Sequence, residues 1–134
     1  MQIQFEISME PVAKGRPRFT RKGFVYTPGK TRSAESEVRR QAEFFKPLTP
    51  LAKQAYVRLL FIMPIPQSMM RTHGHLADKL IMHHTKKPDL DNLEKLVIDA
   101  LNKMFWTDDS IIHTVEKSKR YGNNPRIQIF IQGE

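Results

Sequence analysis

The apolar repeat in residues 92–104 constrains the fold more than any other feature of this sequence. Six apolar side chains recur there with the spacing of one helix face, at Leu93, Leu96, Val97, Ala100, Leu101 and Met104. This period predicts an amphipathic helix that buries one face against the rest of the protein. Asp91 stands at the expected N-cap and Glu94 follows three residues later, which is the pattern of a capping box.

Four other segments have the pattern of β-strands. Residues 2–10 alternate between apolar and polar side chains, and mostly apolar or alternating stretches follow at 54–63, 111–119 and 125–131. The turn sequence YGNNP separates the last two segments, so we expect these two strands to form a β-hairpin.

A second helix is expected over residues 31–46, with Thr31 or Ser33 as its cap. The elements then follow the order strand, helix, strand, helix, strand, strand. This order predicts a single α+β domain over residues 1–134, with a small mixed or antiparallel sheet and two main helices.

Charge is distributed unevenly along the chain. The formal net charge is +8, and residues 11–46 hold ten Lys or Arg against three Glu. Residues 89–109 instead hold six acids against two lysines. This division suits a polyanion held over bound metal cations, and it equally suits a basic protein with one solvated acidic face. The charge pattern alone leaves both interpretations open.

Three features predict a cytoplasmic protein without a membrane span. No apolar run reaches the roughly 18 residues that a transmembrane helix needs. The first ten residues alternate and carry acids, unlike a signal peptide. The chain has no cysteine, which excludes disulfides and thiolate metal sites.

The acidic segment contains the candidate site. Asp89 and Asp91 are two residues apart where the chain enters the helix, and extended chain would point both carboxylates to the same side. Such hard oxygen ligands suit Mg²⁺, with Mn²⁺ as a substitute. Lys95 lies one helical turn beyond Asp91, and one member of the Asp108–Asp109 pair could complete the metal ligation. This set of residues suits metal-assisted hydrolysis of a phosphodiester.

Each of these residues also has a purely structural interpretation. Asp91 could be an N-cap only, and the late aspartate pair could belong to a turn. Lys95 could pair with Asp91 or Asp99 on the helix surface. The sequence pattern leaves these alternatives open.

Residues 11–30 are rich in Pro, Gly and basic side chains, and we expect a loop there with a short extended piece at Phe24–Tyr26. Its cations suit contacts to DNA phosphates, although a solvated basic turn is the alternative. These candidate DNA-binding residues are Lys14, Arg16, Arg18, Arg21 and Lys22.

A second long loop is expected over residues 67–87, and its role is open. It carries four histidines, at His73, His75, His83 and His84. Because no further ligand stands at a suitable spacing, we do not expect a zinc site.

The stretch "KPDLDNLEKLVIDALNKMFWTDDSII" resembles the signature of the RusA family of Holliday junction resolvases, which is close to K-P-D-x-D-N-L-x-K-x-x-x-D-A-L-N-G followed by an aromatic residue and D-D. Upstream, "PVAKGRPRFT" and "YTPGKTRSAE" resemble the basic N-terminal loop and following helix of that family. The resemblance implies a homodimeric, Mg²⁺-dependent endonuclease that cuts four-way DNA junctions by paired nicks in recombination and repair. Many members of the family are encoded by prophages.

The same resemblance assigns roles to individual residues. The catalytic, metal-binding aspartates of the family match Asp89, Asp91 and Asp109, and its essential lysine matches Lys95. Asp108 also fits the motif and is a secondary metal-ligand candidate. One departure is Lys103, which stands where the family often has Gly.

Two other classes of function remain as alternatives at this point. The chain could be a non-catalytic DNA-binding module in which the acids are structural. It could also be a phosphotransfer enzyme that acts on small phosphates, whose ligand binding would lack the steep salt dependence of DNA binding.

Overall fold

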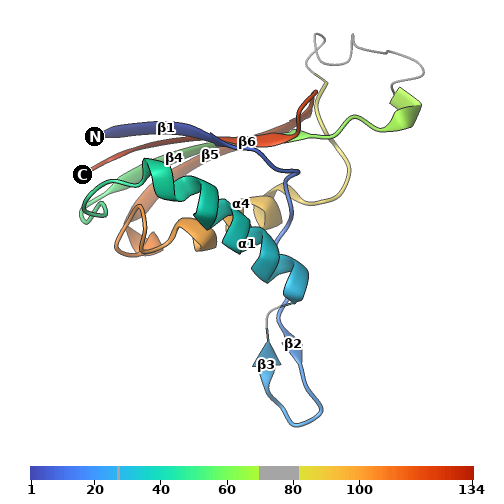
Figure 1. Cartoon of the computed structure of the whole chain (residues 1–134), viewed down its shortest axis with the longest axis horizontal. Coiled ribbons are helices and arrows are strands. Elements are labelled where there is room, and N and C mark those ends of the chain that lie inside the picture. Colours follow the sequence, from blue (N-terminus) through green and yellow to red (C-terminus); the bar gives the residue numbers. More distant parts are fainter. Residues whose placement is uncertain (27, 70–81) are drawn as a thin grey trace.

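A computed structural model describes residues 1–26, 28–69 and 82–134, and these ranges form an α+β fold (Figure 1). Neither of its two main helices, nor any other described helix, has the length and hydrophobicity to cross a membrane. The elements, in chain order, are β1 (Gln2–Ile7), β2 (Arg18–Phe19), β3 (Val25–Tyr26), α1 (Gly29–Ala42), the 3₁₀ turn η1 (Glu43–Phe45), β4 (Ala55–Met63), α4 (Leu90–Leu101), the 3₁₀ turn η2 (Asp109–Ile111), β5 (Ile112–Tyr121) and β6 (Arg126–Gly133).

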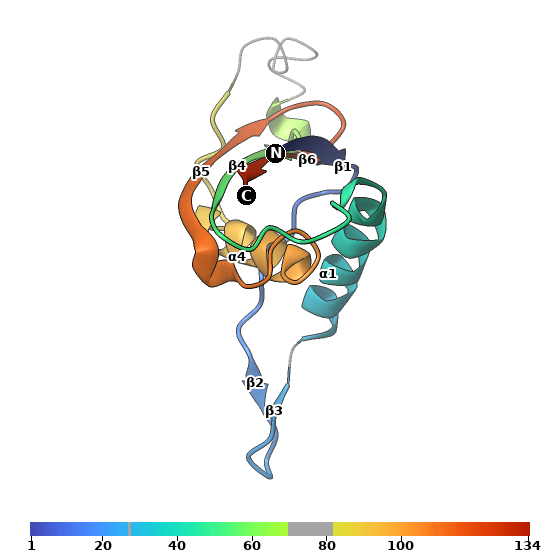
Figure 2. The same ribbon diagram turned by 90° about the vertical axis from the view of Figure 1, so that its left-hand side faces the viewer.

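Four strands form one mixed sheet in the order β1-β6-β4-β5. The β1–β6 and β6–β4 pairs are antiparallel, whereas β4 and β5 are parallel. Figure 2 shows α1 and α4 together on one face of this sheet, with the core between the helices and the strands. The expected α+β fold with a mixed sheet and two main helices is confirmed.

The expected hairpin between the last two strands is wrong, because β4 lies between β5 and β6. The cause is β4 itself, whose apolar run is buried on both sides at its end, where Phe61 and Ile62 are both fully buried. Such a strand belongs in the middle of a sheet. The parallel connection from β4 to β5 is then made by a crossover through α4, and the turn after Tyr121 has to bridge β4.

Helix α4 buries the apolar face that the sequence predicts. Its buried side chains are Leu93, Leu96, Val97, Ile98, Ala100 and Leu101. The helix begins earlier than expected, however, and Asp89 with extended dihedrals (φ −69°, ψ 143°) is its N-cap. The predicted capping box is therefore wrong: Asp91 lies inside the first turn, and the Glu94 carboxylate pairs with Lys117.

Helix α1 also starts before the predicted cap, with Pro28 at its N-cap. Thr31 and Ser33 therefore do not cap it. Thr31 is instead buried, and its hydroxyl accepts a hydrogen bond of 2.9 Å from the backbone amide of Gly15. This bond ties the segment before β2 to the helix.

The expected extended piece near Phe24–Tyr26 is confirmed by β3, and its antiparallel pairing with β2 is a further finding. The two short strands form a hairpin that projects away from the sheet and both helices, as Figures 1 and 2 show. We call residues 16–26 the arm.

Two glycines with different surroundings give a test of the packing at the sheet end. A Cβ at Gly133 would overlap the backbone carbonyl oxygen of Gln54, whereas a Cβ at Gly29 would meet no atom within 4 Å. We expect Gly133→Ala to lower the free energy of unfolding by about 1–3 kcal/mol, as overpacking does. Gly29→Ala should raise it by up to about 1 kcal/mol. Urea unfolding of the two variants measures their free energies of unfolding. Equal values would contradict the close packing of Gly133, at the end of β6, against the backbone of Gln54 before β4.

Candidate active site

Two carboxylates stand exposed where the chain enters α4. Asp89 is the N-cap residue and Asp91 lies in the first turn, yet neither side chain caps the helix. The backbone carbonyl of Asp89 accepts the amides of Asn92 and Leu93, at 3.2 and 3.1 Å. Neither carboxylate has a hydrogen-bond or ion-pair partner among the residues that the structure describes, which leaves four oxygen atoms available to a ligand.

The approach to this pair is held by β5. The Lys119 ammonium donates hydrogen bonds to the backbone carbonyls of Lys86 (2.6 Å) and Pro88 (2.7 Å), and the Lys87–Pro88 peptide bond is cis. Sequence analysis did not identify Lys119, because no local pattern relates it to a loop more than 30 residues earlier. It acts as a positioning residue for the segment that carries Asp89.

Lys95 is exposed one helical turn beyond Asp91, as predicted. The ion pairs suggested as an alternative, with Asp91 or Asp99, are not present, because Asp99 is paired with Lys14. Lys95 has no partner within the described ranges. Its ammonium is therefore available on the same exposed side of α4 as the Asp91 carboxylate.

Lys14 differs from the other predicted DNA-binding residues because its ammonium already has partners. It pairs with the Asp99 carboxylate of α4 and lies 3.3 Å from the Glu35 carboxylate of α1. Its backbone amide also donates to the carbonyl of Asn92 at 2.9 Å. Burial opposes the charge of Lys14, but the hydrogen bond and charge of Asp99 and the charge of Glu35 outweigh it and raise the pKa of the ammonium. Lys14 thus joins the segment before the arm to both helices.

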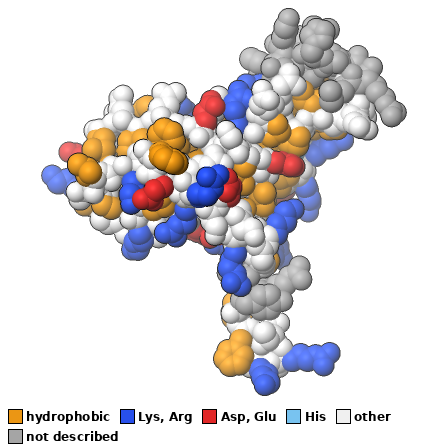
Figure 3. Space-filling model, in the orientation of Figure 1, with side chains coloured by type: hydrophobic (Ala, Val, Ile, Leu, Met, Phe, Trp, Pro, Cys, Tyr) orange, Lys and Arg blue, Asp and Glu red, His pale blue; other side chains and the backbone are white. Residues whose placement is uncertain are grey.

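The remaining predicted cations lie on the arm. Arg16, Arg21 and Lys22 are exposed, and Arg18 lies in β2. Figure 3 shows basic side chains around the far end of the arm, away from the sheet. Contact with DNA by these residues stays a prediction.

The late aspartates lie in and beside η2, and they have different surroundings. The Asp108 carboxylate accepts the Ser110 amide at 3.1 Å, and this hydrogen bond, together with the nearby Lys103 charge, lowers the pKa of Asp108. Asp109 is exposed and its carboxylate has no partner in the described part of the chain. Asp108 therefore holds the turn, and Asp109 is the better ligand candidate of the two.

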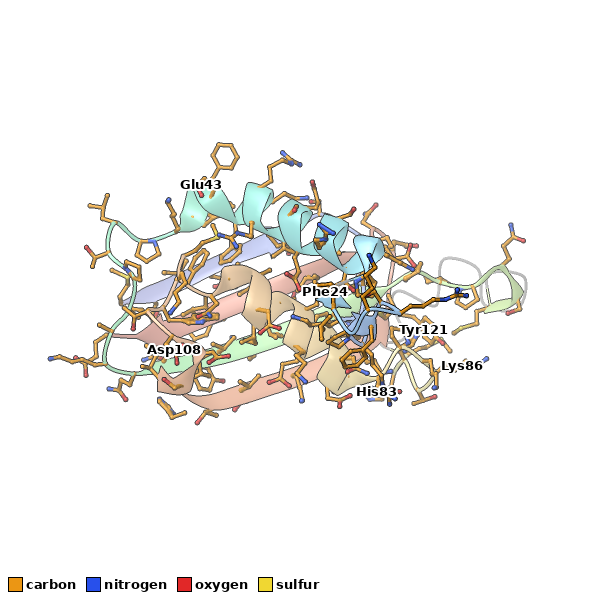
Figure 4. The ribbon with its side chains drawn as sticks, turned by 90° about the horizontal axis from the view of Figure 1, so that it is seen from below. Phe24, Glu43, His83, Lys86, Asp108 and Tyr121 are labelled. Carbon is orange, nitrogen blue, oxygen red and sulfur yellow. The ribbon has the colours of Figure 1, made fainter. Side chains whose placement is uncertain are left out.

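One chain does not bring Asp109 to the other two aspartates. Helix α4 runs antiparallel to β5, since Pro88 lies near Lys119 and the turn after the helix returns the chain to the start of β5. The 12 residues of α4 alone span about 18 Å. Figure 4 shows Asp108 and Lys86 at opposite ends of the sheet. Among the described residues, no three acids, histidines or cysteines group closely enough to hold a metal ion.

Within the described ranges, the histidines belong to no group that could hold a metal ion. His84 is buried, and its ring packs on Tyr121 with centroids 4.8 Å apart. Burial and the charge of Lys119 lower the pKa of His84, which favours the neutral ring. His83 is exposed, while His73 and His75 lie outside the described residues.

A small α+β domain with unpaired carboxylates at a helix start and a basic arm has the parts of an enzyme that acts on nucleic acid. The comparison with known proteins agrees with this class. The family model described as Endodeoxyribonuclease RusA matches residues 8–132, and the chain belongs to this family of endodeoxyribonucleases. The chain is also 33% identical, over 135 residues, to "Uncharacterized protein YqaN" of Bacillus subtilis (strain 168), and the match covers 97% of this chain and 95% of that protein.

The Lys14–Asp99 pair gives a test of how the arm is anchored. Lys14→Met should lower the free energy of unfolding by about 1–3 kcal/mol, because it leaves two partly buried carboxylates without their cation. Adding Asp99→Asn to Lys14→Met should lower it little further, so a double-mutant cycle in urea should give a coupling energy of about 0.5–3 kcal/mol. Lys22→Met, at the exposed tip of the arm, is the control and should leave stability unchanged. A coupling energy of zero would contradict this anchoring role.

Proposed function

We propose that this protein is a Mg²⁺-dependent, structure-selective endonuclease that resolves four-way DNA junctions by paired nicks, in DNA recombination and repair. The observation that carries the proposal is the unpaired Asp89 and Asp91 at the start of α4, inside a chain of the RusA family. The basic arm beside them supports a polyanionic substrate.

The donor set at the start of α4 fits Mg²⁺. This ion is usually held by one or two carboxylates together with water and substrate phosphate oxygens, and Mn²⁺ accepts the same ligands. Asp89 and Asp91 supply two such carboxylates, both exposed to an incoming phosphate. When bound, a divalent cation would activate a water molecule and neutralise charge on the scissile phosphate.

The neighbouring residues have roles that do not depend on the number of metal ions. Lys95 projects from the turn that follows Asp91 and can place its ammonium on a phosphate oxygen as negative charge develops there. The positive end of the α4 dipole favours an anion at the same place. Lys119 holds the segment before Asp89, so that the two aspartates keep one arrangement.

A homodimer would give Asp109 access to the site. Asp109 lies beyond the far end of α4 from Asp91, so it can contribute only to a site whose other aspartates belong to a second chain. A two-fold arrangement would form two equivalent sites, and a four-way junction has approximate two-fold symmetry. Paired nicks follow from two such sites acting on one junction.

The first test of the proposal is the substitution Asp91→Asn. The protein with a labelled four-way junction and Mg²⁺ should produce symmetric nicks, and it should give only bound complex without the metal. Asp91→Asn should keep junction affinity within about threefold but lower the nicking rate by about 10³-fold, because a metal ligand supplies several kcal/mol of transition-state stabilisation. Glu43→Gln, an exposed acid at the far end of α1, is the control and should nick normally.

Other results of this assay would identify the alternatives. A band shift without nicks, at any Mg²⁺ or Mn²⁺ concentration, would indicate a non-catalytic DNA-binding module. Weak binding that barely changes with salt would instead indicate an enzyme for small phosphates. Asp91→Asn protein that nicks at the wild-type rate would remove Asp91 from catalysis.

Mixing two inactive variants tests whether Asp109 acts across the dimer. Asp91→Asn and Asp109→Asn should each be inactive alone. If Asp109 acts on the partner's site, a mixed dimer has one site with both substitutions and one site with neither. Equal mixing should then restore about a quarter of the wild-type sites, since about half of the dimers are mixed and half of their sites are intact. Mixed dimers should leave single nicks, and a mixture with no activity would contradict the shared site.

A further inference from the structure

The arm exposes aromatic side chains that the fold itself does not use. Phe19 is 72% exposed and Phe24 is 68% exposed, and Val25 beside them is also exposed. Their positions are fixed by a tight turn, in which the Thr20 amide donates to the Phe24 carbonyl at 2.7 Å and the Gly23 amide donates to the Thr20 carbonyl at 2.9 Å. Three large apolar side chains exposed together on one short hairpin indicate a surface that a partner covers.

The two aromatic rings belong to opposite faces of the arm. Phe19 is opposite Val25 in the β2–β3 register, so these side chains share one face. Phe24 precedes Val25, and successive side chains of extended chain point to opposite faces. The arm is therefore a thin, two-sided projection with an aromatic group on each side.

The charge of the arm selects the kind of partner. Arg16, Arg21 and Lys22 are exposed around the phenylalanines, and the sequence has no acid between Glu10 and Glu35. A second copy of this chain carries a net charge of +8, so its surface as a whole repels a cationic arm. Nucleic acid matches both properties, because phosphates attract the cations and bases offer flat faces for the aromatic rings.

We infer that the arm inserts at the branch point of a DNA junction. There Phe19 and Phe24 would stack on the end bases of the two DNA duplexes on either side of the arm. The inference rests on the proposed function only in taking branched DNA as the substrate. Bases inside a continuous duplex already stack on each other, whereas the branch interrupts this stacking and exposes base faces. The arm would then distinguish branched from linear DNA without reading sequence.

The position of the arm relative to Asp89 agrees with this role. A cleft of about 580 Å³ runs from the base of the arm, at Arg16 and Pro28, to Pro88, which is the neighbour of Asp89. The extended chain from Pro17 to Thr20 spans about 10 Å before the turn at the tip of the arm. A backbone lying in the cleft and a branch point at the tip can thus belong to the same junction.

Binding without Mg²⁺ tests the inference independently of cleavage. Phe19→Ala/Phe24→Ala should lower the affinity for a four-way junction by at least about 30-fold, because it removes two base–aromatic stacking contacts. Its affinity for linear duplex of the same sequence should change by less than about threefold, because the cations remain. The control is Phe44→Ala, since Phe44 is 85% exposed at the other end of α1 and should change neither affinity.

Tryptophan reporters detect the stacking directly. Trp106 is fully buried, so a second tryptophan at the arm tip gives a separate, exposed signal. Phe24→Trp fluorescence should be quenched by the junction but not by linear duplex, and Phe44→Trp fluorescence should respond to neither. Unchanged Phe24→Trp fluorescence in a saturated junction complex would overturn the inference.

Three other results would overturn it as well. The alanine pair could weaken junction and duplex binding equally, which would reduce the arm to a contact with the DNA backbone. It could convert a dimer to a monomer in sedimentation, which would make the arm an interface between two copies. Finally, the wild-type protein could show no preference for the junction. A protein that passes these binding tests but never nicks would contradict the proposed nuclease function and leave the role of the arm intact.

Discussion

The burial of one face of α4 against the sheet determines where the candidate catalytic groups can lie. Six side chains of the helix are buried, and burying each large aliphatic one stabilises the fold by about 1.5–3 kcal/mol. With that face fixed, Asp91 and Lys95 are held on the solvent side. The same packing keeps the length of the helix between Asp91 at its start and Asp109 beyond its end. A site made of Asp89, Asp91 and Asp109 of one chain is therefore incompatible with this fold.

The charges form two groups with different functions. Lys14, Asp99 and Glu35 form a partly buried ion-pair cluster that connects the base of the arm to both helices. Arg16, Arg21 and Lys22 have no acids near them in the sequence and are exposed, so they can contribute to the attraction of a polyanion. Lys14 thus has a structural role in an ion-pair cluster, whereas the cations of the arm that follow it carry positive charge without a neighbouring acid. Sequence position alone would not separate Lys14 from Arg16.

Local sequence patterns predicted the helices, the strands and the exposed side of α4 well. They failed where the outcome depends on distant parts of the chain. The turn after Tyr121 has the composition of a hairpin, but the burial of β4 decides that this strand separates β5 from β6. Asp89 and Asp91 are equally good caps by composition, and the contacts of Lys119 to the preceding loop belong to tertiary structure. The separation of Asp109 from Asp91 follows from the direction of β5, which no local pattern specifies.

Lys103 shows how backbone strain and local order oppose each other next to Asp109. Its φ of 72° is in the left-handed region, where glycine is favoured and other residues lose about 1–2 kcal/mol. Yet the Lys103 ammonium donates to the Thr107 carbonyl at 2.7 Å and lies 3.7 Å from Asp108. A glycine at position 103 would relieve the backbone strain, and it would also remove the contacts of the ammonium with Thr107 and Asp108. With glycine the backbone would be less strained, but the turn that carries Asp108 and Asp109 would lose both contacts of the lysine ammonium and become less ordered.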